Sequence, residues 1–156
     1  MTVEVSLARV VMEMDVPGED WTPYLNRRTG EFATLADDDV RAFEDGRDPE
    51  YMDSAEIRQV LESNDWLTLP TRFDIHEYSI MESFCQTVES EQEREELFVA
   101  IRGRGAFRMF KHWVHRLGIQ DDWYRFREQA FEEIAVEWLE QHDIQYSRTP
   151  ISADNS

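Results

Sequence analysis

The stretch Ile101–Arg127, which reads IRGRGAFRMFKHWVHRLGIQDDWYRFR, decides how the C-terminal half of this chain folds. It contains seven basic residues and only two acidic ones, a net charge of +5, although the whole chain carries −18. Everything outside the stretch therefore carries −23. Cations gathered in this way repel one another, so either another part of the fold or a ligand must compensate them.

The periodicity of this stretch predicts an amphipathic helix from about Gly105 to Leu117. At about 100° per residue, the basic and histidine side chains fall within an arc of about 140°. These side chains are Arg104, Arg108, Lys111, His112, His115 and Arg116. The apolar side chains fill the rest of the helix surface: Ala106, Phe107, Met109, Phe110, Trp113, Val114 and Leu117.

The segments around this helix are also predicted to be helical, from Asp74 almost to the end of the chain. Asp74–Glu77 and Ser90–Glu93 both fit the capping box that begins many helices. The last helix is expected to begin near Asp121. Its apolar stripe contains Tyr124, Phe131 and Trp138.

The N-terminal half combines short helices with short strands. Ser6 is placed to cap a helix that extends to Met14. Strands at Tyr24–Leu25 and Glu31–Leu35 flank the loop Asn26–Gly30, a pattern that predicts a β-hairpin. Two acidic helices follow, and then a segment that could form a third strand: Asp38–Glu44, Ser54–Ser63 and Trp66–Leu69.

These patterns predict an α+β fold that is mostly helical. A short N-terminal β-hairpin, joined by the third strand if it forms, packs with a C-terminal helical half. The length of 156 residues favours a single globular domain, which we place over residues 1–146. Residues 147–156 are polar and predict a flexible C-terminal tail.

The composition bears on the compartment and on the surface. The first twenty residues include Glu4, Glu13 and Asp15, which argues against a signal peptide or a membrane-spanning helix. Cys85 is the single cysteine, so no intrachain disulfide can form. We therefore expect a cytoplasmic protein that is not bound to membranes. Its 34 acidic residues are best explained as a solvated acidic surface, which keeps a protein soluble at high ionic strength. Mimicry of a nucleic-acid backbone is the alternative.

The basic helix contains the one candidate ligand site. Gly103 and Gly105 would let backbone N–H groups approach an anion at the start of the helix, with Arg104, Arg108 and Lys111 as charged partners. In the alternative, this face packs on the five glutamates of residues 89–96. We prefer the alternative, because arginines are often paired internally and a lone Gly-x-Gly is weak evidence.

Other kinds of chemistry find little support. His112 and His115 have a spacing that can bind a metal, but no further ligand follows at a suitable spacing, so we expect no metal and no cofactor. Cys85 lies on an apolar stripe with acidic neighbours, which predicts a buried thiol whose thiolate is disfavoured. No nucleophile elbow, Walker or zinc-protease motif is present, and we therefore lean against an enzyme.

Several motifs in order resemble a known family. They are YLNRRTGE at 24–31, Leu69-Pro70 ahead of EYSIM at 77–81, GRGAFRMFK at 103–111, HRL at 115–117, Trp123-Tyr124 and EWL at 137–139. Over about Met14 to Ile144 the chain resembles the bacterial proteins catalogued as uncharacterised protein family 158. The resemblance implies a bacterial single-domain protein and no particular activity.

The function expected from these observations is that of a small non-enzymatic domain that binds a partner. The basic face would serve as one contact and the hairpin loop as another, through Arg27, Arg28 and His115. The alternative is a phosphate- or nucleotide-binding protein or enzyme that uses Gly103–Lys111. Non-specific binding to DNA or RNA is not expected, since a charge of −18 opposes a polyanion.

Overall fold

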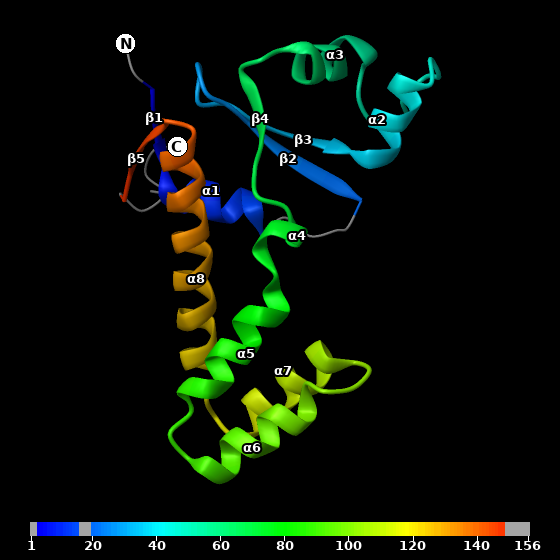
Figure 1. Ribbon diagram of the computed structural model, residues 1–156. Coiled ribbons are helices and arrows are strands. Elements are labelled where there is room, and N and C mark those ends of the chain that lie inside the picture. The colour runs from blue at the N-terminus through cyan, green and yellow to red at the C-terminus, as the bar shows by residue number, and fades with distance from the viewer. Residues whose placement is uncertain (1–2, 16–19, 149–156) are drawn as a thin grey trace. The chain divides into compact units, whose positions relative to one another are not determined.

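The computed structural model describes residues 3–15 and 20–148, apart from the side chains of residues 72 and 73 (Figure 1). The chain forms two compact units. The first unit comprises Met1–Thr71 and Ile134–Ser156, and the second unit comprises Arg72–Glu133. The fold is α+β and mostly helical, as the sequence predicts. The prediction of one domain over residues 1–146 stays a prediction.

The first unit contains the predicted hairpin and third strand. Strands β2 (Trp21–Asn26) and β3 (Phe32–Ala36) are antiparallel, and β4 (Trp66–Thr68) pairs with the other edge of β2. The strand order is therefore β3-β2-β4. Leu25, which is fully buried, lies opposite Phe32 on one side and Leu67 on the other.

The hairpin loop is closed by its own polar groups. The Oδ1 atom of Asn26 accepts the backbone N–H groups of Arg28 at 2.8 Å and Thr29 at 3.1 Å. Gly30 has a φ of +77°, and a Cβ atom at this position would lie 2.9 Å from Cγ1 of Val3. Both observations explain why glycine ends this loop.

Three helices complete much of the first unit. In α1 (Leu7–Met14), Oγ of Ser6 accepts the N–H of Arg9 at 3.3 Å, which confirms the predicted cap. Helices α2 (Asp37–Glu44) and α3 (Ser54–Glu62) follow the sheet. Leu35 of β3 packs with two side chains of α3, and a shell of half-buried residues surrounds this cluster. The two side chains are Ile57 and Val60.

A buried carboxylate fixes the connection between α2 and α3. Asp39 is only 2% exposed. Its two oxygens accept the backbone N–H groups of Glu50 at 2.8 Å, Tyr51 at 3.1 Å and Met52 at 3.0 Å. This carboxylate therefore satisfies three donors that would otherwise lack partners in a connection without regular structure.

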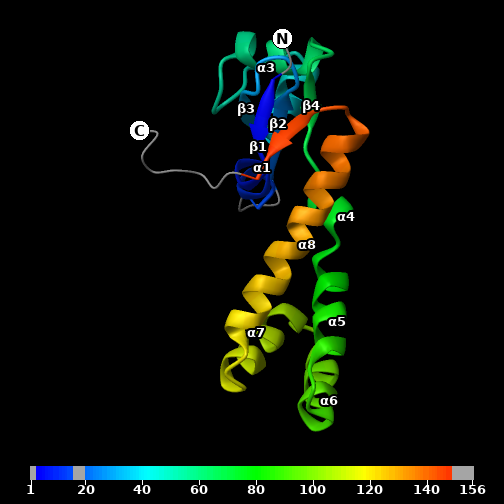
Figure 2. The ribbon, with the colours of Figure 1, turned by 90° about the vertical axis from the view of Figure 1, so that its left-hand side faces the viewer.

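A second, parallel pair of strands in this unit was not predicted. Strand β1 (Glu4–Ser6) pairs with β5 (Gln145–Ser147), as Figure 2 shows. Three-residue strands are too short for an alternating pattern, so the sequence contains no clear signal for them. Ser147, where the predicted tail begins, ends β5. Residues 149–156 of the predicted tail lie outside the described residues.

The second unit is helical. It contains α4 (Arg72–Ile75), α5 (Glu77–Thr87), α6 (Glu91–Ala100), α7 (Ala106–Arg116) and the first part of α8 (Gln120–Gln141). Aromatic rings form its core. The ring centroids of Phe110 and Trp123 are 4.7 Å apart, and that of Phe84 lies 6.0 Å and 5.4 Å from them. These contacts between ring edges and faces add to the gain from burying apolar area.

Of three predictions for this unit, one is confirmed and two are wrong. Ser90 caps α6 through a 3.3 Å bond from the N–H of Glu93, as expected. The capping box at Asp74–Glu77 is wrong, because His76 adopts a left-handed conformation (φ +52°) and separates α4 from α5. Tyr124 is also wrong as a core residue: it is 62% exposed, and its neighbour Trp123 is buried instead.

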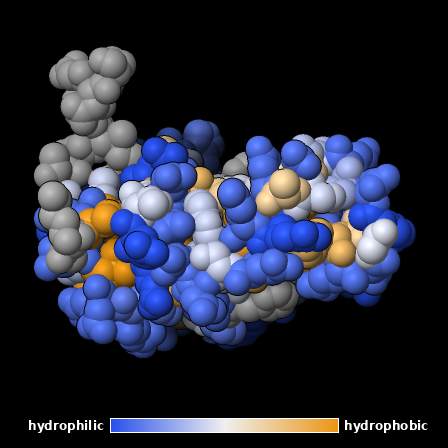
Figure 3. Space-filling model, turned by 90° about the horizontal axis from the view of Figure 1, so that it is seen from above, coloured by the Kyte–Doolittle hydropathy of each residue, from blue (hydrophilic) through white to orange (hydrophobic). Residues whose placement is uncertain are grey.

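The surface agrees with the acidic composition. The face shown in Figure 3 is mostly hydrophilic, with small apolar areas between the polar side chains. Among the helices that the structure describes, none is both apolar enough and long enough to cross a lipid bilayer.

Replacing Asp39 with alanine should lower the free energy of unfolding by about 3 kcal/mol, since three backbone donors lose their acceptor. Denaturant melts measure this change. Asp38→Ala is the matched control, because Asp38 lies in the same first turn with a 78% exposed side chain. The control should change stability by less than about 0.5 kcal/mol. Equal losses in the two variants would contradict the role given to Asp39.

Candidate functional site

The candidate site is the segment Arg102–Lys111, called here the basic segment. It begins after α6 and continues through the first residues of α7, and the connection projects from the two helices (Figure 1). Gly105 precedes α7 with a φ of +70°. A Cβ atom at Gly103 or Gly105 would meet no atom within 4 Å. The space around these two glycines is therefore open, and the connection does not enclose a binding site.

The core of the second unit orients α7. Phe110 and Val114 are buried, and this places the basic arc on the outside of the helix. Two of the apolar side chains that the helical pattern places outside the basic arc, Phe107 and Met109, are not buried: they are 45% and 40% exposed. At about 100° per residue, these two side chains flank opposite edges of the basic arc. The exposed face of α7 is therefore basic with apolar borders.

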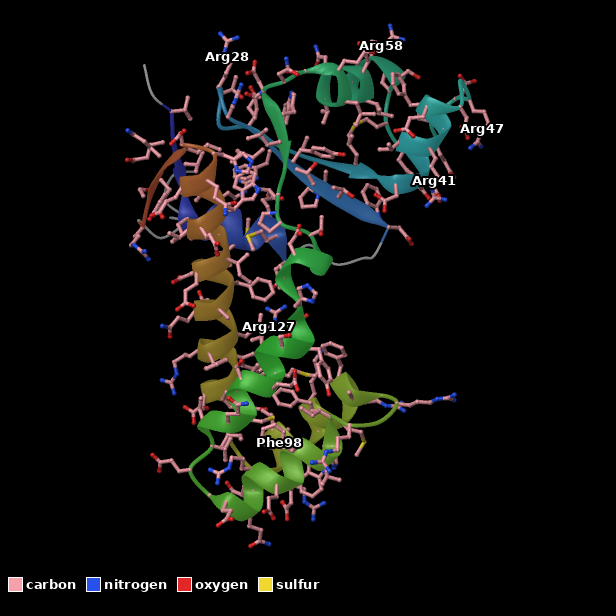
Figure 4. The ribbon with its side chains drawn as sticks, viewed as in Figure 1. Arg28, Arg41, Arg47, Arg58, Phe98 and Arg127 are labelled. Atoms are coloured by element: carbon pink, nitrogen blue, oxygen red, sulfur yellow. The ribbon has the colours of Figure 1, made fainter. Side chains whose placement is uncertain are left out.

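Most cations of this chain have a partner among the described residues. Carboxylates lie near Arg9, Arg27, Arg28, Arg41, Arg47, Arg58, Arg125 and Arg127. Figure 4 shows Arg28, Arg41, Arg47 and Arg58 at the edge of the first unit. Arg94 donates to the carbonyl oxygen of Val88, and Arg116 and Arg148 lie over aromatic rings.

The basic segment differs from this pattern. Arg102, Arg104, Arg108 and Lys111 are all exposed. Across residues 3–15 and 20–148, no carboxylate, carbonyl or aromatic ring pairs with any of these four side chains. The unpaired cations are thus gathered in one short segment, in a chain with about twice as many acidic as basic residues.

The preferred expectation, that this face packs on the glutamates of residues 89–96, is therefore wrong. Helix α6 ends at Ala100, and α7 then returns alongside it (Figure 1). Ten residues of helix span about 15 Å, so the start of α6 lies far from the connection that contains Arg102 and Arg104. Segments that are close in sequence are in this case at opposite ends of a helical hairpin.

The C-terminal cations of the stretch Ile101–Arg127 behave differently. Arg125 pairs with Asp122 at 2.6 Å. Nε of Arg127, which is labelled in Figure 4, lies 2.6 Å from Oε1 of Glu77. The guanidinium of Arg127 lies 4.2 Å from the ring centroid of Phe131. The C-terminal end of the stretch is compensated internally, so only the basic segment is a candidate for binding.

The residues of the second predicted contact, in the hairpin loop and at His115, belong to different units. Arg27 and Arg28 belong to the first unit and share Asp65, at 3.5 and 3.6 Å. His115 belongs to the second unit, where its Nδ1 atom lies 2.8 Å from Oε1 of Gln120. His115 continues the basic arc of α7, whereas the charges of Arg27 and Arg28 are partly compensated.

The second unit contains a hollow of about 630 Å³ that sequence patterns do not predict. Its lining comes from α5, the start of α6 and α8, and includes Phe84, Ser90, Glu93, Asp122 and Phe126. Ser90 is engaged in capping α6, and Asp122 is paired with Arg125. Residues so far apart in sequence form no motif, which is why sequence patterns could not identify this hollow.

Among the residues that it describes, the structure provides no new candidate for thiol or metal chemistry. Cys85 is fully buried, and burial raises the pKa of its thiol to about 11, in agreement with the predicted disfavoured thiolate. Within the described part of the chain, no group of three His, Cys, Asp or Glu side chains could hold a metal ion.

Comparisons with known proteins identify relatives. The model of the uncharacterised protein family UPF0158 matches residues 45–150, which include the whole basic segment. The UPF0158 protein PA5073 of Pseudomonas aeruginosa strain PAO1 is 34% identical over 67 residues. This alignment covers 42% of the present chain and 44% of that relative, so it spans less than half of the relative's length. No solved structure matches.

Because the basic segment has no internal partner, the double variant Arg104→Ala/Arg108→Ala should change the free energy of unfolding by less than about 0.5 kcal/mol. Arg127→Ala serves as the contrast and should lose about 1–2 kcal/mol, since it strands Glu77 and uncovers Phe131. Denaturant melts compare the variants. A loss in the double variant as large as that of Arg127→Ala would mean that the segment is paired after all.

The raised pKa of Cys85 predicts alkaline destabilisation. The unfolded thiol titrates near pH 9 and the folded one near pH 11, so the native state favours the protonated form. The resulting stabilisation is complete below about pH 9 and is lost as the pH rises to about 11. Wild type should lose about 2 kcal/mol more over this range than Cys85→Ala. Parallel pH profiles of the two proteins would contradict this.

Proposed function

This chain belongs to the uncharacterised protein family UPF0158, and we propose that it is a non-enzymatic binding protein whose basic segment contacts a negatively charged partner. The observation that supports the proposal is the set of four unpaired cations on the basic segment. Repulsion among Arg102, Arg104, Arg108 and Lys111 is unfavourable in the free protein. A partner with carboxylates at matching positions would relieve it.

The apolar borders of the basic arc support a protein as the partner. Phe107 and Met109 flank the cations and expose apolar surface, which a protein segment could cover. Exposed ion pairs contribute only about 0.2–1 kcal/mol each, so charge alone would give weak binding. Apolar contacts beside the charges would add affinity and select among acidic partners. His115 extends the same face and is included in the proposed contact.

The state of the thiol supports the non-enzymatic part of the proposal, because it argues against thiol chemistry. Cys85 is the only cysteine of the chain, and it is buried and protonated at neutral pH. Thiol chemistry needs an accessible thiolate. We further propose a cytoplasmic location, in which such a thiol stays reduced without protection.

Phosphate or nucleotide binding by Gly103–Lys111 is the second candidate function. It is supported by the position of Gly105 before α7, because the first N–H groups of a helix lack intrahelical acceptors. The open surroundings of Gly103 and Gly105 count against it. A phosphate at this place would remain largely hydrated and would gain little over bulk water.

Photo-crosslinking in the native cell tests the proposal. A benzoylphenylalanine at Phe107 should give a discrete product with a specific protein, whereas the same group at Tyr51, 62% exposed in the first unit, should not. The purified partner should bind Arg104→Ala/Arg108→Ala at least about 10-fold more weakly, the equivalent of 1.4 kcal/mol. Arg41→Ala/Arg58→Ala, which removes two paired arginines, should bind normally.

Absence of any product at Phe107, or equal affinities for both double variants, would contradict partner binding by the basic segment. Titration of the labelled protein with inorganic phosphate and ATP tests the second candidate in parallel. Saturable NMR shifts confined to residues 103–108 would favour the phosphate site instead.

A further inference from the structure

The helical hairpin that contains the basic segment also contains unpaired acidic groups. No cation lies within ion-pair distance of the five glutamates of residues 89–96 in the part of the chain that the structure describes. Of these, Glu91 and Glu95 are exposed and lie one turn apart on α6. The open end of the hairpin, at the start of α6, is thus acidic, and the connection between its two helices is basic. Among the described residues, no ion pair joins the two.

An apolar side chain lies between the two charged ends. Val99 follows Glu95 by one turn on the outer face of α6. It is 64% exposed, the highest value among the large hydrophobic side chains of the described residues. The outer stripe of α6 therefore runs from carboxylates through an apolar side chain to the cations at Arg102 and Arg104.

This arrangement is self-complementary. An isologous dimer uses the same patch on both copies, which a two-fold axis relates. Acidic groups on one side of the axis in one copy can then face basic groups of the second copy. An axis near Val99, with the two α6 helices antiparallel, would bring Glu91 and Glu95 of each copy towards the basic segment of the other. The same operation would bring the two Val99 side chains together.

The distribution of charge between the units permits such a contact. The second unit contains 13 acidic and nine basic residues, a net charge of −4. The first unit contains 21 acidic and seven basic residues, a net charge of −14. An approach through the second unit therefore meets much less like charge than the total of −18 suggests.

We propose that the partner of the basic segment is a second copy of this chain, bound through the acidic start of its α6. This inference rests on the proposed function, since it names the partner of the same surface. Exposed ion pairs around a small apolar contact give a weak, transient interface, so dimers should form at protein concentrations on the order of 100 µM.

Charge exchange tests the proposal by analytical ultracentrifugation. Arg104→Glu/Arg108→Glu and Glu91→Arg/Glu95→Arg should each weaken self-association at least about 10-fold, because the substituted side chains of one copy then face like charges on the other. An equimolar mixture of the two variants should restore the dimer, since the introduced carboxylates of one face the introduced guanidinium groups of the other. Arg41→Glu/Arg58→Glu makes the same change in net charge on α2 and α3 and should dimerise like wild type.

Circular dichroism establishes that each variant folds. Should a charge reversal unfold the protein, the neutral variants Arg104→Gln/Arg108→Gln and Glu91→Gln/Glu95→Gln replace it, each with a weakened dimer as the expected result. A wild type that stays monomeric up to 1 mM, or a mixture that does not associate, overturns the proposal. A crosslink from Phe107 to a different protein would then leave the proposed function standing without self-association.

Discussion

The excess of carboxylates over cations is the constraint on which the surface of this protein depends. With 34 acidic and 16 basic residues, an exposed arginine has many chances to lie near a carboxylate. Most described arginines do, and some of these pairs brace the fold. Arg127 joins α5 to α8 through Glu77, and Asp65 holds the hairpin loop through the two neighbouring arginines. The four cations of the basic segment differ from these arginines, because they form no ion pair that could stabilise the fold.

The aromatic core of the second unit explains why these cations face outward. Phe110 packs against Phe84 and Trp123, and this contact fixes the rotation of α7 about its axis. Once that side is buried, the basic arc can only face solvent. The helical hairpin formed by α6 and α7 then separates the basic segment from the glutamates at the start of α6. Packing of apolar rings thus determines where unpaired charge appears.

Local patterns predicted the local structure well. Ser6 as a cap, the hairpin around Asn26–Gly30 and the position of α7 all follow from side-chain chemistry within a few residues, and the structure confirms them. The parallel pair β1–β5 joins residues about 140 positions apart and leaves no local signal. The carboxylate of Asp39 looked like one of three successive acidic residues, and only the fold shows that it binds three backbone donors.

For the candidate site, too, the sequence predicts one part and misses another. Helical spacing is enough to predict its residues and its basic arc. It does not predict that these cations lack partners, because segments that are close in sequence lie at opposite ends of the helical hairpin. Nitrogen-detected NMR of the arginine side chains tests the central claim directly, since a paired guanidinium rotates slowly about its Cζ–Nε bond and a free one rotates fast. At low protein concentration, Arg102, Arg104 and Arg108 should rotate fast and Arg127 slowly. Rotation of the three as slow as that of Arg127 would contradict an unpaired basic segment.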